Sequence, residues 1–139
     1  MSRLRILAGA VLVAGILSCG SPRALETRLW SDSFAVRITS DPVPPRAVED
    51  VVFKVVVQDK KTGEFIQNGE GRVYGTSRDR ANVNDGLAPA KELGTYYAHI
   101  LFPTTGDWAM GIQVRRNPQS RLETLTWIQT VNNPTGPGS

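Results

Sequence analysis

The sequence predicts an all-β fold, an immunoglobulin-like antiparallel β-sandwich of about seven strands. Short segments alternate apolar and polar residues, and clusters of glycine, proline and asparagine separate them. After the first 18 residues, no segment shows the 3.6-residue apolar period of an amphipathic helix. Because isolated hairpins are unstable in water, the apolar faces of these strands are expected to pack against one another. A small closed barrel is the alternative arrangement.

The N-terminal segment has the features of a secretory signal peptide. Arg3 and Arg5 precede an apolar run of 12 residues, from Ile6 to Leu17. A helix of that length reaches about 18 Å, well short of the roughly 30 Å of a bilayer's hydrocarbon core. We therefore predict a cleaved signal over residues 1–18 rather than a membrane-spanning helix.

The end of this run, Ile16-Leu-Ser-Cys19, resembles the lipobox of bacterial lipoproteins. The resemblance implies that Cys19 becomes the first residue of the mature chain and carries acyl chains, such as palmitate, that hold it to the bilayer. Cys19 is the only cysteine, so no intramolecular disulfide competes for it. These features predict a lipid-anchored protein of the cell envelope. Gly20 favours the outer membrane if the host is Gram-negative, because aspartate at that position favours inner-membrane retention in enteric bacteria.

The remainder of the chain is long enough for one domain with a modest core. We predict a lipidated tether over residues 19–29, a sandwich over residues 30–131 and a disordered tail over residues 132–139, because small, polar and turn-forming residues dominate both flanks. The formal net charge of +3 falls to near +1 once Arg3 and Arg5 leave with the signal. The charge therefore gives no support to nucleic-acid binding, and no nucleic-acid partner is predicted.

Four segments show the clearest two-residue period, and a last strand carries Leu125, Trp127 and Val131 on one side. Shorter strands are expected near residues 65–66 and 71–75. Residues 76–94 hold few large apolar side chains and are expected to form a long polar connection. In the four clearest segments, the residues expected to face the core are Phe34, Val36 and Ile38; Phe53, Val55 and Val57; Tyr96, Ala98, Ile100 and Phe102; and Trp108, Met110, Ile112 and Val114.

Three segments resemble the YtkA-like (FixH-like) family of exported or membrane-tethered immunoglobulin-like domains. The first, Val51–Val57 with its turn to Gly63, resembles the pattern V-x-D-x-x-T-G. The second, residues 94–103, and the third, residues 106–108 with the strand that follows, together resemble G-x-Y-x-A-x-x-x-F-P-x-x-G-x-W. The resemblance implies an immunoglobulin-like sandwich with Trp108 as a core anchor. Copper-related roles inferred for the family depend on Met and His residues before the Gly-Tyr strand. The segment from Thr76 to Leu93 contains no Met, His or Cys.

The mature chain offers few residues for metal or acid–base chemistry. Soft metal ions require several thiolate, thioether or imidazole ligands together. His99 and Met110 are the candidates, and the strand period places them on opposite faces of their sheets. His99 is therefore only a weak metal candidate, and no cofactor is predicted. No G-x-S-x-G motif accompanies a serine, so we predict no catalytic residues and no enzyme activity.

The polar segment 76–94 is the predicted contact surface, since loops on rigid sandwiches commonly carry binding sites. The sequence thus predicts a membrane-anchored accessory lipoprotein whose domain binds another envelope protein without catalysis. The alternative, raised by the family resemblance, is a periplasmic carrier of copper or another metal, or an assembly factor for a metal-dependent membrane complex. The candidate partner-binding residues are Arg78, Arg80, Asn82, Asn84, Asp85 and Tyr97.

Overall fold

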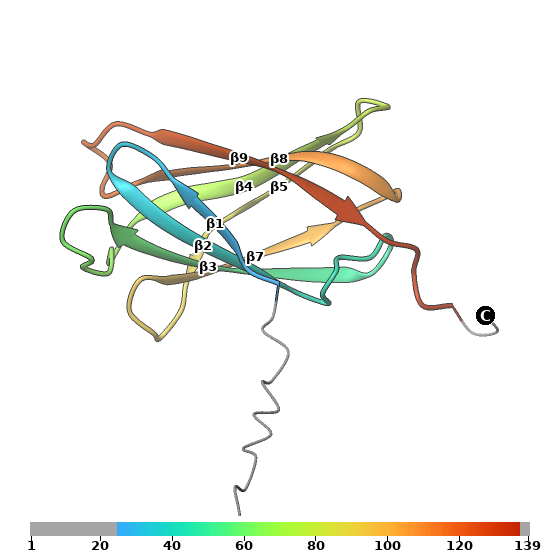
Figure 1. The fold of residues 1–139 in the computed structure, drawn as a ribbon, viewed down its shortest axis with the longest axis horizontal. Coiled ribbons are helices and arrows are strands. Elements are labelled where there is room, and N and C mark those ends of the chain that lie inside the picture. The colour runs from blue at the N-terminus through green and yellow to red at the C-terminus, as the bar shows by residue number, and fades with distance from the viewer. Residues whose placement is uncertain (1–24, 137–139) are drawn as a thin grey trace, which may run out of the picture.

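The computed structural model describes residues 25–136, so the predicted signal and Cys19 lie outside the described residues. Two antiparallel sheets pack face to face as two layers (Figure 1). The predicted all-β sandwich is confirmed, with nine strands in the described residues in place of about seven. The strands are β1 (Thr27–Trp30), β2 (Phe34–Asp41), β3 (Asp50–Asp59), β4 (Glu70–Ser77), β5 (Asn82–Gly86), β6 (Ala88–Pro89), β7 (Thr95–Leu101), β8 (Gly106–Arg115) and β9 (Glu123–Val131).

The strand order is that of an immunoglobulin-like sandwich. Sheet I has the order β1-β2-β3-β7-β6, and sheet II has the order β5-β4-β8-β9. Without β1, these orders correspond to the A-B-E-D and C′-C-F-G sheets of immunoglobulin domains. β1 adds an extra edge strand to sheet I, where it pairs with β2.

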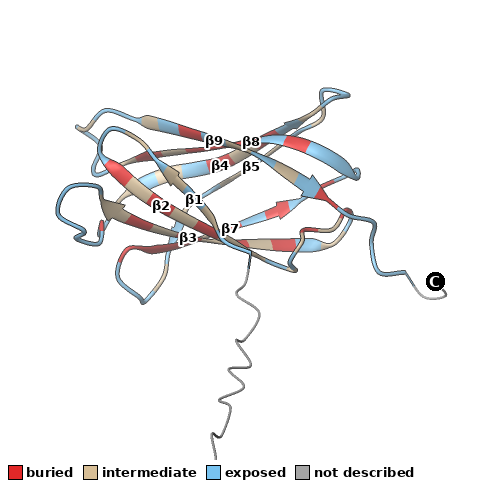
Figure 2. Ribbon diagram, viewed as in Figure 1, coloured by how far each residue is buried: buried red, intermediate tan, exposed pale blue. Residues whose placement is uncertain are grey.

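The core lies between the two sheets and is built by the two-residue period of the strands. Every residue predicted to face inward from the four clearest segments is buried, as the alternating red positions along the strands in Figure 2 show. Trp108 is fully buried, its ring centroid lies 5.1 Å from that of Phe102, and its Nε1 donates to the Thr104 carbonyl. Phe102 also meets Phe53 edge to face at 6.2 Å. Aromatic pairs of this kind add to the stabilisation that burial supplies.

The sandwich begins before the predicted boundary at residue 30. β1 starts at Thr27, and its register with β2 runs from Thr27 opposite Ile38 to Trp30 opposite Ala35. Only Leu29 of this strand packs against the core cluster. A strand of four residues with one core contact shows too little alternation to be detected in the sequence, so the predicted tether was too long.

In the predicted disordered tail, residues 132 and 135 are hydrogen-bonded to the segment before β3, which corrects the prediction for this part of the tail. Asn132 donates its N–H to the Pro45 carbonyl and accepts from Ala47 N–H, at 2.8 and 2.9 Å. The Glu49 carboxylate accepts from the hydroxyl of Thr135 at 2.7 Å and from its N–H at 2.9 Å. These long-range hydrogen bonds cannot be deduced from a run of turn-forming residues.

The sequence predicted one long polar connection over residues 76–94, but the structure contains two strands there. β4 continues to Ser77 and turns tightly into β5, whose ladder pairs Tyr74 with Asn84 and Thr76 with Asn82. The two-residue strand β6 follows and pairs with β7. Backbone hydrogen bonds, rather than alternating apolar residues, define the strands of this segment. Its contacts with the core come from partly buried residues such as Val83 and Leu87.

Candidate functional site

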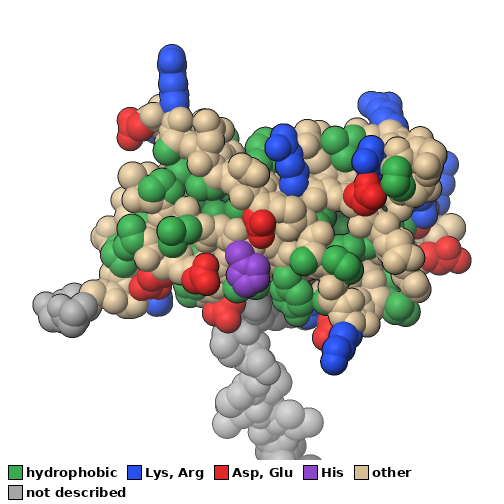
Figure 3. All heavy atoms as spheres, turned by 180° about the vertical axis from the view of Figure 1, so that it is seen from behind, with side chains coloured by type: hydrophobic (Ala, Val, Ile, Leu, Met, Phe, Trp, Pro, Cys, Tyr) green, Lys and Arg blue, Asp and Glu red, His purple; other side chains and the backbone are tan. Residues whose placement is uncertain are grey.

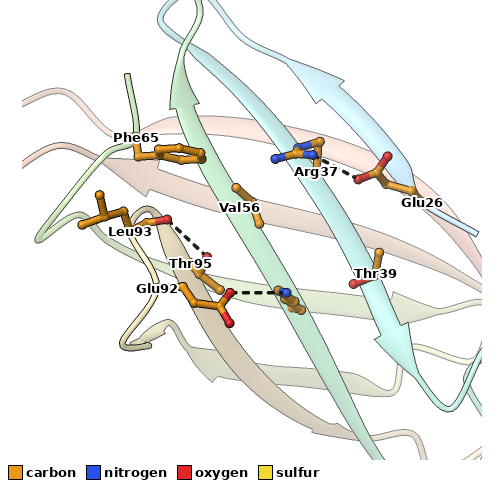
Figure 4. Close-up of a pocket in the computed structure, with 9 residues that line it drawn as sticks. Glu26, Arg37, Thr39, Val56, Phe65, Glu92, Leu93 and Thr95 are labelled. Atoms are coloured by element: carbon orange, nitrogen blue, oxygen red, sulfur yellow. Dashed lines mark hydrogen bonds and ion pairs between the residues drawn. The ribbon is translucent and has the colours of Figure 1, made fainter. Parts of the chain in front are cut away.

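A groove of about 390 Å³ crosses the outer face of sheet I (Figure 4). We call it the charged groove. Val56 lies in the middle, with β1 and β2 on one side and the segments before β4 and β7 on the other. Its lining residues are the charged Glu26, Arg37, Lys54 and Glu92, the apolar Val56, Phe65 and Leu93, and the hydroxyl-bearing Thr39 and Thr95.

The strand period that builds the core also points the groove's central side chains outward. Arg37 of β2 pairs with Val56 of β3, and Thr39 pairs with Lys54. Their neighbours along each strand are buried between the sheets, so these four side chains extend from the opposite face. The charged groove is thus set on two central strands of a hydrogen-bonded sheet, which is a rigid support for a binding surface.

The four charged side chains of this groove form two partly exposed ion pairs. Arg37 Nη1 lies 3.8 Å from Glu26 Oε1, and Lys54 Nζ lies 3.5 Å from Glu92 Oε2. Solvent-exposed pairs of this kind contribute about 0–1 kcal/mol, so each cation can exchange its carboxylate for one on a partner at little cost. Arg37 Nε is buried and has no hydrogen-bond partner within residues 25–136.

The apolar wall of the groove is fixed by hydrogen bonds beneath it. The Tyr96 hydroxyl donates to the Ile66 carbonyl at 2.6 Å and accepts from Gly69 N–H at 2.9 Å. Phe65 packs directly on Gly94, where an added Cβ would lie 2.8 Å from the Phe65 Cβ. Gly94 also has a positive φ of 66°, which favours glycine. These contacts hold the backbone at Phe65 in place, and its side chain lines the groove while remaining 43% exposed.

A second groove, of about 280 Å³, lies between the start of β1, the loop after β2 and strand β9. We call it the uncharged groove, because none of its lining side chains carries a charge. Thr39 is shared with the charged groove. Its lining residues are the apolar Leu25, Ile38, Val43, Pro44, Pro45, Phe53 and Ile128, and the polar Thr27, Thr39, Ser40, Gln129 and Thr130.

The residues predicted to bind a partner do not form one surface. Arg78 and Arg80 are exposed in the turn between β4 and β5, where Arg80 has a positive φ of 64° and donates its N–H to the Ser77 carbonyl. Asn82 and Asn84 are exposed on β5, and Asn82 Oδ1 accepts from the Thr76 hydroxyl at 2.9 Å.

Asp85 lies at the seam between the two sheets rather than at this turn. Its Oδ2 accepts from the backbone N–H of His99 at 2.7 Å, which ties β5 of sheet II to β7 of sheet I. Tyr97 is half-buried on the outer face of sheet I, directly opposite Lys54 in the ladder. Of the predicted residues, only Tyr97 therefore borders the charged groove, and the others lie on or beside β5 of sheet II.

His99 is exposed and Met110 is buried, so these two residues face in opposite directions as predicted. The single histidine is visible on the surface in Figure 3, with acidic side chains near it. Within residues 25–136, no three or more His, Cys, Asp and Glu side chains are grouped in a way that suits a metal ion. The same residues include no helix long and apolar enough to cross a bilayer.

One feature of the sequence indicated the charged groove, but the prediction of the contact surface overlooked it. In the segment from Val51 to Val57, Val52 and Val56 point away from the core, on the same outer face as Lys54. Apolar residues on the outer face of a half-exposed strand indicate a covered or contacting surface. Phe65 and Leu93 reach the groove from distant loops, and no sequence pattern indicates their position.

Comparisons with known proteins support the fold and extend no further. No protein-family model matches the chain, and no curated protein is detectably similar. The crystal structure of a DUF4426 family protein from Pseudomonas aeruginosa PAO1 is similar, with a TM-score of 0.58, 12% identity, and coverage of 77% of this chain and 94% of that one. At this identity the similarity concerns the fold alone. The resemblance to YtkA-like domains stays a prediction.

Proposed function

We propose that this chain is a lipid-anchored accessory protein of the bacterial envelope whose sandwich binds another envelope protein without catalysis. The observation that carries the proposal is the charged groove, which gathers four charged side chains and three apolar ones on the outer face of sheet I. Its central residues lie on two paired strands of the sheet. Its ion pairs are weak enough to break in favour of ion pairs with a partner.

The composition of the charged groove suits a protein partner. Interfaces combine an apolar centre with a polar rim, and arginine and aromatic residues carry much of the binding energy. Phe65 and Leu93 supply exposed apolar surface, and Arg37 supplies a partly exposed guanidinium that, within the described residues, is held only by its ion pair with Glu26. Because acids and bases alternate around the groove, a partner with the complementary pattern would be bound in one orientation.

The predicted anchor would place this groove where envelope proteins are concentrated. Leu25, the first described residue, follows Cys19 by six positions. A domain held by acyl chains meets membrane proteins at a high effective concentration, so a groove of modest area is sufficient for useful binding.

The test is affinity purification of the tagged full-length protein from crosslinked native membranes, read by mass spectrometry. One envelope protein should be recovered with the wild type, and Lys54→Glu should abolish its recovery because the change reverses a charge in the groove. Arg78→Glu is the matched control, since it makes the same change in an exposed turn elsewhere.

Three results would argue against this proposal. Recovery of nothing above background would contradict a stable partner. Loss with Arg78→Glu but not with Lys54→Glu would move the site to the turn between β4 and β5. Recovery of copper transporters or respiratory oxidase subunits would favour the metal-assembly alternative. Separately, a signal peptidase II inhibitor should cause the precursor to accumulate, and its failure to do so would contradict the anchor.

A further inference from the structure

The uncharged groove is an exposed apolar surface made by three separate segments. Leu25 before β1 is 74% exposed, Ile128 of β9 is 69% exposed, and Val43 in the loop after β2 is 38% exposed. All three line the same groove, so they form one surface rather than scattered apolar residues. Contiguous apolar surfaces with a polar rim mark contacts with proteins, ligands or membranes.

The chemistry of this groove favours a lipid surface over a protein partner. None of its lining side chains is charged, so a bilayer can cover it without removing a charge from water. Pro44 and Pro45 form part of its rim and have no N–H group, so that stretch leaves few backbone donors without a partner in an apolar medium. The hydroxyl and amide side chains around it, such as Thr27 and Gln129, suit the headgroup region.

The position of the groove on the chain gives the second argument. Leu25 lines it and follows Cys19 by six residues, which span at most about 20 Å even when fully extended. If Cys19 carries acyl chains, this groove cannot be held far from the headgroups. A surface kept this close to the bilayer needs only a small apolar area to rest on it.

We propose that the uncharged groove is the face by which the sandwich rests on the bilayer, with Leu25, Val43 and Ile128 in the interfacial region. This inference rests on the proposed lipid anchor and goes beyond it, because an anchor alone leaves the orientation of the domain free. A domain fixed in this way would hold the charged groove of sheet I in a constant orientation toward membrane partners.

The test uses the full-length acylated protein in vesicles of phosphatidylethanolamine and phosphatidylglycerol that contain brominated lipid. Ile128→Cys provides a single free thiol for an environment-sensitive fluorophore, because the one natural cysteine is acylated. Leu93→Cys is the matched control, since Leu93 is similarly exposed, at 57%, but lines the charged groove. Lipid quenching is expected to be several-fold stronger for the label at position 128 than at position 93.

Flotation of the vesicles separates the two claims. If the protein floats with the vesicles but both labels are quenched equally, the anchor stands and the docking face is wrong. If the label at position 128 is shielded from aqueous iodide without quenching by lipid, a second copy of the chain covers the groove and the inference is wrong. If the protein does not float, the anchor fails and this inference fails with it.

An aspartate substitution checks the same inference from the other direction. Leu25→Asp places a charge in the groove at a mostly exposed position, so the fold should tolerate it. It should sharply reduce the lipid quenching of a label at position 128 while flotation is unchanged. Leu101→Asp, at a site that is 60% exposed and outside this groove, should leave the quenching as it is. Equal effects of the two substitutions would contradict the proposed face.

Discussion

The two grooves are neighbours at strand β2 and differ most in charge. Thr39 lines both, yet four charged side chains surround the charged groove and none surrounds the other. They also differ in depth. The uncharged groove reaches Phe53, which is 1% exposed in the core, whereas the charged groove has Val56, a half-exposed residue of the outer face, at its centre.

This difference shows how one sandwich can present two kinds of surface. Side chains on the outer face of β2 and β3 are free to carry charge, because they do not contribute to the core. The gap between the edge strands β1 and β9 instead has at its base buried residues whose main role is packing, such as Ile38 and Phe53. Charge suits a specific protein contact, and its absence suits a lipid surface.

The largest expected effect comes from the inner wall of the uncharged groove. Phe53 meets the rings of Phe102 and Trp127 edge to face, at centroid distances of 6.2 and 6.4 Å. Phe53→Ala should lower the free energy of unfolding by about 3–5 kcal/mol, measured by urea denaturation. Val56→Ala, in the other groove, should cost only about 1 kcal/mol because that side chain is only partly buried on the outer face. Similar losses would contradict the difference in depth.

Next in size is the support beneath the apolar wall of the charged groove. Tyr96→Phe keeps the buried ring but removes the hydroxyl that bonds Ile66 and Gly69. Leaving these backbone groups without a partner should cost about 1–3 kcal/mol in urea denaturation. Because Phe65 adjoins Ile66, partner recovery should weaken as well. Tyr97→Phe changes a hydroxyl for which no such bonds exist in the described residues, and it should cost much less.

A smaller effect on stability is expected from the ion pairs of the charged groove. The Lys54–Glu92 pair is exposed, so Lys54→Glu should change the free energy of unfolding by about 0.5 kcal/mol or less. The same variant should nevertheless lose its envelope partner. A large loss of stability would mean that lost binding reflects unfolding rather than a lost contact.

The smallest effect concerns the tail near the uncharged groove. The hydrogen bonds from the hydroxyl and the N–H of Thr135 hold the pKa of Glu49 below its usual value of 4.5. A lowered folded-state pKa stabilises the protein above the unfolded pKa, and this stabilisation is lost as the pH falls through the folded value. In urea denaturation between about pH 3 and pH 6, Glu49→Gln should show a weaker fall in stability than the wild type. An unchanged pH dependence would contradict the carboxylate's role.

Strands with long alternating faces could be predicted from the sequence, and the grooves could not. The period of two is strong from Val51 to Val57 and from Trp108 to Val114, so their core faces were predicted correctly. β1 and β5 were missed because backbone pairing, rather than alternation, defines them.

The grooves depend on register and on chain connections, neither of which composition reveals. Arg37 and Lys54 line one groove because the ladder between β2 and β3 sets them two positions apart along the strands in one register. Leu25, Val43 and Ile128 come from three segments far apart in the chain. The predicted contact residues from Arg78 to Asp85 lie close together in sequence, but Asp85 bonds to β7 at the seam between the sheets. Tyr97, predicted as an exposed aromatic residue, lies on the outer face of sheet I instead.

The most direct measurement places a photo-crosslinking diazirine amino acid at position 93 or 128 of the full-length protein in native membranes. Mass spectrometry then identifies whether each position is joined to a protein or to a lipid. The account predicts a protein adduct from position 93 in the charged groove and a lipid adduct from position 128 in the uncharged groove. The same adduct from both positions, or a protein at 128 and lipid at 93, would contradict it.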